Sequence, residues 1–160
     1  MHGAAEFGPQ FQRTLVRACI EDPGLRSLVV SLGREYALAF TDPASAWAWQ
    51  AVQATESPSV LQLTTEAARL EAGESAGVQA ILTGSDWRES EYVRSQVTAW
   101  AQRQIFKAGF EAARVAWNKG DVETARTTML RKIEEMSSVD LETADRGWFF
   151  EEFEARQERR

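Results

Sequence analysis

The side chains that could do chemistry are few, and their spacing forms no catalytic or metal-binding pattern. The chain has one histidine, His2, and one cysteine, Cys19, which are too few ligands for a zinc site. His2 lies next to the N-terminus, so a Ser-His-Asp or Cys-His centre would have no well-placed base. No Gly-Lys dipeptide occurs, so the P-loop pattern that cradles phosphates is absent. The carboxylate pair Glu134-Glu135 falls on a predicted solvated helix face. We therefore predict no catalytic, cofactor-binding or metal-binding residue in this chain.

The six tryptophans raise the question of nucleic-acid stacking. That mode of binding also needs a basic groove, and no Lys or Arg lies between Arg34 and Arg69, the stretch that contains Trp47 and Trp49. The net charge of −6 and a pI near 4.9 argue further against a basic surface that binds the phosphates of a nucleic acid. Core packing is the better interpretation of these tryptophans.

Length and composition indicate one folded domain, or one domain with an arm. The chain has 160 residues, of which 44% are hydrophobic, enough to build a core. One cysteine allows no internal disulfide, which suits a reducing compartment. The sequence has neither the pattern of a signal peptide nor an apolar run of 18 residues, so we expect a cytoplasmic protein without membrane association.

The first half of the sequence predicts short helices separated by turns, because all four prolines lie within it. A first helix should begin near Pro9 and end at Asp22. A second should carry the apolar period from Leu25 to Tyr36, and a third should run from Ala44 to about Ala54, with Asp42 as its N-cap. A fourth should follow a capping box at Ser59. Residues 73–84 read as a loop-rich stretch that holds at most one helical turn.

The second half predicts a long helical hairpin. From Asp86 no strong breaker appears until Asn118, which gives a helix of about 32 residues and about 48 Å. Gly120 should form a turn and Asp121 should cap a second helix that reaches Met136. A short loop between two apolar stripes predicts an antiparallel pair that projects from the head. Its uncovered side should mediate self-association, and the predicted interface residues are Phe106, Phe110, Trp117, Met129 and Ile133.

The last stretch has a different character. A polar joint from Ser137 to Asp145 should precede a short amphipathic helix whose anchors are Trp148, Phe149 and Phe153. This helix either folds back on its own head or docks on another subunit, in the helix-in-groove manner. The predicted fold is therefore all-α: a disordered terminus (1–7), a helical head (8–84), a projecting hairpin (86–136) and a linker with a docking helix (137–160).

The order of these parts resembles the N-terminal domain and linker of DnaB-type replicative DNA helicases, in particular phage-like members. The local matches are short and mostly apolar, and their sequential order over about residues 8–160 makes the resemblance. They are Ile20-Glu21-Asp22-Pro23, Phe40-Thr41-Asp42-Pro43 with Trp47, Trp49, Ala51 and Val52, Pro58-Ser59-Val60-Leu61-Gln62-Leu63, Tyr92-Val93 with Val97, Arg103, Ile105 and Ala112-Ala113, and the tail from Ala144 to Arg160.

This resemblance implies an assembly module of the primosome. Such domains pair through their hairpins and form a collar over the ATPase ring, and the collar offers surfaces to primase and to helicase loaders. The linker helix packs on the motor of the adjacent subunit. ATP, Mg²⁺ and single-stranded DNA belong to the motor domain, which this sequence lacks, so the chain is either part of an ATP-dependent helicase or a stand-alone relative.

Two other classes of function stay open. A free-standing helical adaptor, such as a helicase loader or inhibitor, would have the same helical pattern. A DNA-binding regulator is the third, and the acidic pI opposes it.

Overall fold

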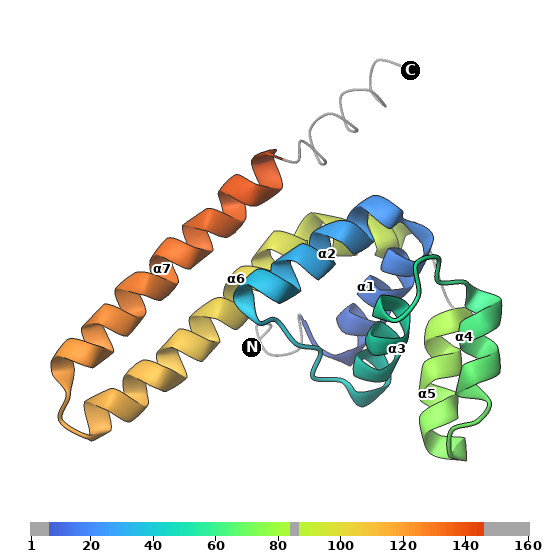
Figure 1. The fold of residues 1–160 in the computed structure, drawn as a ribbon, viewed down its shortest axis with the longest axis horizontal. Coiled ribbons are helices and arrows are strands. Elements are labelled where there is room, and N and C mark those ends of the chain that lie inside the picture. The colour runs from blue at the N-terminus through green and yellow to red at the C-terminus, as the bar shows by residue number, and fades with distance from the viewer. Residues whose placement is uncertain (1–6, 84–86, 146–160) are drawn as a thin grey trace. The chain divides into compact units, whose positions relative to one another are not determined.

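The computed structural model describes residues 7–83 and 87–145, with side chains placed for 7–83 and 91–140. This part of the chain is all-helical, as the sequence predicted, and it contains seven helices and no strand. None of its helices is long and apolar enough to cross a membrane. The helices are α1 (Pro9–Glu21), α2 (Pro23–Tyr36), α3 (Pro43–Gln53), α4 (Val60–Ala67), α5 (Ala72–Thr83), α6 (Trp87–Asn118) and α7 (Val122–Asp145), shown in Figure 1.

The chain forms two compact units, Met1–Gln96 and Val97–Arg160. In the first unit α1 packs against α2, α3 and α5, and α5 lies between α3 and α4 (Figure 1). The second unit contains most of α6 together with α7, which run antiparallel as a hairpin. The predicted order of helical head and long hairpin is confirmed.

The helix starts of the first unit follow local signals in the sequence. Asp22 ends α1 and caps α2, because its side chain accepts hydrogen bonds from Gly24 N and Leu25 N. Asp42 caps α3 through Ser45 N, and Ser59 caps α4 through Gln62 N. These caps satisfy N–H groups that have no partner inside the helix. The caps at Asp42 and Ser59 lie where the sequence predicted them, whereas Asp22 was predicted only as the end of the first helix.

The core of the first unit is apolar and closely packed. One cluster of buried residues joins α1, α3, α4 and α5, with Trp47 and Trp49 half-buried against it, so the prediction of core packing for these tryptophans is confirmed. Arg17 ties α1 to α5 by donating to the Leu82 carbonyl at the end of α5. The cluster comprises Val16, Ile20, Ala48, Val52, Leu63, Ala67, Val78, Ile81 and Leu82.

Two predictions about secondary structure were wrong. Residues 73–84 were expected to be loop-rich, but α5 spans Ala72–Thr83 and places Val78, Ile81 and Leu82 in the core. The burial of that apolar face outweighs the low helix propensity of Gly73 and Gly77. The joint expected from Ser137 is likewise helical, because α7 continues to Asp145.

Candidate functional site

The hairpin is closed by small side chains along its inner line of contact. Ala113, Ala116 and Ala125 are buried there, and Met129 packs against them. Gly109 faces Lys132 so closely that a Cβ on Gly109 would lie 2.5 Å from Lys132 Cγ. Small residues let two helices approach each other, so the inner line of the hairpin is made without large aromatic side chains.

The turn of the hairpin is fixed by the backbone and by one cap. Gly120 has a φ of +80°, and Asp121 N donates to Ala116 O at 2.9 Å, which is the C-terminal hydrogen bond of a Schellman-type ending. Asp121 then caps α7, since its carboxylate accepts from Thr124 N and Thr124 Oγ1. The hydroxyl and backbone hydrogen bonds from Thr124 lower the pKa of Asp121. The predicted turn and cap are confirmed.

Large apolar side chains lie on the outside of the hairpin. Phe106, Phe110 and Trp117 of α6 expose 45–63% of their surface, and Val122 and Ile133 of α7 each expose 51%. The rings of Phe106 and Phe110 stack with their centroids 6.4 Å apart. Exposed aromatics in contact with each other form a patch rather than scattered single residues.

Helical register places these five side chains on one side of the hairpin. At 100° per residue, these side chains are displaced from the line of contact by about 40–90°, and the sense of rotation is the same in both helices. Because the helices are antiparallel, the same sense of rotation carries both sets to the same side. We call Phe106, Phe110, Trp117, Val122 and Ile133 the aromatic face.

Charged side chains on the hairpin form ion pairs with neighbours three residues away in their own helix. Arg114 lies 2.8 Å from Glu111, and Lys132 lies 3.0 Å from Glu135. Pairs of this kind contribute little to stability and leave no net charge.

The five residues predicted for self-association divide into two groups. Phe106, Phe110, Trp117 and Ile133 lie on the aromatic face, whereas Met129 is half-buried against the inner alanines. Val122 joins the face, although the prediction left it out of the interface. The predicted linker anchors, Trp148, Phe149 and Phe153, lie outside the described residues.

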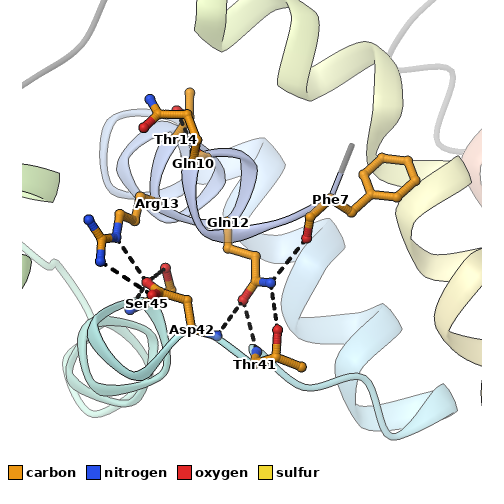
Figure 2. A network of polar contacts seen from close by, with 8 residues as sticks. All are labelled: Phe7, Gln10, Gln12, Arg13, Thr14, Thr41, Asp42 and Ser45. Carbon is orange, nitrogen blue, oxygen red and sulfur yellow. Dashed lines mark hydrogen bonds and ion pairs between the residues drawn. The ribbon is translucent and has the colours of Figure 1, made fainter. Parts of the chain in front are cut away.

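A polar network on the head joins residues that are far apart in sequence (Figure 2). Gln12 is almost fully buried, and its amide donates to Phe7 O and Thr41 Oγ1 while its carbonyl oxygen accepts from Thr41 N and Asp42 N. Arg13 donates from Nε to Asp42 Oδ2 at 3.0 Å and from Nη2 to Oδ1 at 3.3 Å. The network holds the segment before α3 against α1.

The pKa of Asp42 reflects this network. Burial alone would raise the pKa of the carboxyl, but hydrogen bonds from Arg13 and Ser45 and the charge of Arg13 outweigh it and hold the pKa below its usual value. Asp42 therefore stays ionised as the cap of α3. Sequence reasoning found the cap but missed Gln12 and Arg13, because no local pattern links them to residues 41–42.

A cavity of about 360 Å³ lies beside this network on the head. Arg13 and Asp42 form its polar wall, and Trp47 lies among its apolar lining residues. Its other side is α5, the helix that the sequence did not predict, with Gly73, Glu74 and Gly77. Its size falls within the range of about 300–1,000 Å³ that is usual for ligand pockets.

The described residues support neither a metal site nor a reactive cysteine. No group of three His, Cys, Asp or Glu side chains lies together there in a way that could hold a metal ion. Cys19 is fully buried, and burial raises the pKa of its thiol far above the usual range. No family model, curated protein or solved structure matches this chain.

Proposed function

We propose that this chain is an assembly module that self-associates through the aromatic face of its hairpin, as the N-terminal collar of a DnaB-type replicative helicase. The observation that carries the proposal is the set of five half-exposed apolar side chains on one side of α6 and α7. Contiguous apolar patches on soluble domains are usually covered by a partner. Primase or a helicase loader would be further partners of such a collar.

The size of the face suits a reversible contact between two copies. Two faces together contribute ten side chains, and burying each half-exposed group yields about 1 kcal/mol. Association costs about 4–15 kcal/mol in lost freedom of motion. The two magnitudes are similar, so the pairing should be concentration-dependent in an isolated chain and reinforced inside a larger ring.

The resemblance in the order of helices supports the helicase part of the proposal. A helical head with Asp-Pro helix starts, a long hairpin and an acidic-aromatic tail follow one another as in that family. A free-standing helical adaptor is the second candidate, because the apolar face alone favours a partner without naming it. The reading frame after codon 160 separates the two: a P-loop within about a hundred codons fits a helicase, and a stop codon fits an adaptor.

The substitution Phe110→Glu tests self-association. Phe110 is 53% exposed in the single chain, so a charge there leaves the fold intact, whereas a charge buried without a partner in the interface costs several kcal/mol. Light scattering should give the monomer mass for Phe110→Glu at concentrations where the unaltered chain is dimeric or larger.

Val115→Glu is the matched control. Val115 lies on the same helix and is 49% exposed, but it points about 140–180° away from Phe106, Phe110 and Trp117. This variant should keep the mass of the unaltered chain. If Phe110→Glu keeps that mass too while remaining helical, the interface is elsewhere.

A further inference from the structure

The cavity on the head has the features of a preformed binding site. It lies among α1, α3 and α5, all within the first unit, and Pro43, Trp47, Leu70 and Val78 give it apolar walls. Such walls favour aliphatic or aromatic groups, and Trp47 offers an indole surface.

Two glycines one turn apart in α5 shape the cavity in different ways. At Gly77 a Cβ would lie 3.1 Å from Ala44 Cβ, so α5 and α3 are in close contact there. At Gly73 a Cβ would meet nothing within 4 Å. The cavity is therefore closed at Gly77 and open at Gly73.

The polar wall is held rigidly. Asp42 is engaged by Arg13, Ser45 N and Ser45 Oγ, and Ser45 is fully buried. The network fixes the Arg13 guanidinium at the cavity before any ligand arrives (Figure 2). Because this wall is already ordered, less conformational entropy is lost when a ligand binds.

Charge selects the kind of ligand. Three charged side chains line the cavity, and two of them, Arg13 and Asp42, neutralise each other. The third, Glu74, is exposed and forms no ion pair with any residue that the structure describes. Residues 1–96 carry 12 acidic and 7 basic side chains, so the surrounding field is negative as well.

We propose that this cavity binds a basic, apolar peptide segment of a partner protein. An arginine or lysine stem would lie against Trp47, with its cation over the indole or paired with Glu74, and a neighbouring aliphatic side chain would fill the space beside Gly73. This site lies on the head and does not depend on pairing through the hairpin.

The test is an NMR titration of the ¹⁵N-labelled full chain with two short probes, acetyl-Leu-Arg-Leu-Arg-amide and acetyl-Leu-Glu-Leu-Glu-amide. The basic probe should shift the amide signals of Glu74, Gly77 and Val78 and the indole signal of Trp47, and the acidic probe should bind more weakly. Equal binding of both probes, or shifts that avoid these residues, would overturn the proposal.

Gly73→Met is the variant that fills the cavity. Its Cβ meets open space and methionine is a better helix former than glycine, so α5 should persist while affinity for the basic probe falls at least about tenfold. Glu74→Gln keeps the shape and should weaken binding about threefold, the scale of an exposed ion pair.

Gly33→Met is the matched control, because Gly33 is also a helical glycine with open space around it. Gly33 lines a different cavity, between α2 and α3, whose charged lining residue is Arg34. Binding should survive Gly33→Met and also Phe110→Glu, which separates this site from the hairpin face. Loss of binding in Gly33→Met but not in Gly73→Met would assign the peptide to the other cavity and refute the proposal.

Discussion

At the scale of single residues, Ala37 is the one non-glycine residue with a positive φ in the part of the chain that the structure describes. Ala37 ends α2 with φ 56° and ψ 41°, a left-handed conformation that glycine adopts more easily than alanine. Its side chain is exposed, so the methyl group contributes no packing that would offset the strain.

Ala37→Gly should therefore stabilise the protein, by about 0.5–1 kcal/mol. Urea denaturation followed by circular dichroism measures the change. Ala108→Gly is the control, at an exposed position inside α6. It should lower the free energy of unfolding by about 1 kcal/mol, the opposite effect to Ala37→Gly. A destabilised Ala37→Gly would show that the left-handed ending of α2 is not adopted in solution.

Asp42 links folding to pH. Its pKa is lower in the folded chain than in the unfolded one, because hydrogen bonds from Arg13 and Ser45 outweigh the effect of burial. The resulting stabilisation is present above the unfolded pKa of about 3.9 and is lost as the pH falls through the lower folded value.

Asp42→Asn retains a capping oxygen but removes the charge. We expect it to lower the free energy of unfolding by about 1–2 kcal/mol at pH 7, since hydrogen bonds to a charged acceptor are the stronger kind. The difference from the unaltered chain should shrink as the pH falls below about 4. Urea titrations at pH 7 and pH 3 measure both, and a difference independent of pH would contradict the assignment.

At the scale of elements, Gly109 sets how closely α6 and α7 approach each other. A Cβ at this position would lie 2.5 Å from Lys132 Cγ and 2.9 Å from Lys132 Cβ, so the near part of that side chain would have to move. Overpacking of this kind costs about 1–3 kcal/mol, which exceeds the gain of about 1 kcal/mol from alanine's helix propensity.

Gly109→Ala should therefore destabilise the hairpin, whereas Gly33→Ala, made where a Cβ meets open space in α2, should stabilise the protein by up to about 1 kcal/mol. Thermal denaturation of the two variants gives shifts of opposite sign if the close contact exists. Equal stabilisation in both would mean that the hairpin is wider at Gly109.

Local signals made much of this fold predictable. Pro23 and Pro43 at helix starts, the Asp and Ser caps before α2, α3, α4 and α7, and Gly120 in the hairpin turn act over a few residues and can be recognised in one sequence. The start signal at Asp86 and the lack of a strong breaker before Asn118 predicted the bounds of α6 to within a residue. Such features depend little on the rest of the molecule.

Features that depend on distant partners were missed. Gly73 and Gly77 weaken a helix locally, and α5 exists because its other face is buried against α3 and α4. Ser137 and Ser138 read as a joint, but their hydroxyls donate to carbonyls four residues earlier and Val139 is buried, so α7 continues. Gln12 contacts Thr41, 29 residues away, and no spacing rule reaches that far.

At the scale of the whole molecule, the head and the hairpin differ in how they bury large apolar side chains, and this difference supports the proposed self-association. The head buries most of its large apolar side chains, with Leu15, Leu25, Leu28 and Leu32 at most 1% exposed and Leu61 an exception at 78%. Toward its turn the hairpin closes on alanines and leaves Phe106, Phe110 and Trp117 outside, although Trp100 and Ile105 earlier in α6 are buried. Burial of these exposed side chains against a second copy would add hydrophobic stabilisation, which the head already obtains from its own core.

Self-association should then link stability to concentration. A partner that binds only the folded chain raises the midpoint of thermal unfolding, Tm, with each increase in free partner above Kd. For a chain of this length we expect about 2–5 °C for each tenfold rise in concentration. Phe110→Glu should show no such dependence and should match the unaltered chain at high dilution, because Phe110 packs outside the core of the single chain. Differential scanning calorimetry over a hundredfold range of concentration decides the matter, and a constant Tm for the unaltered chain would mean that its aromatic face is not covered by a second copy.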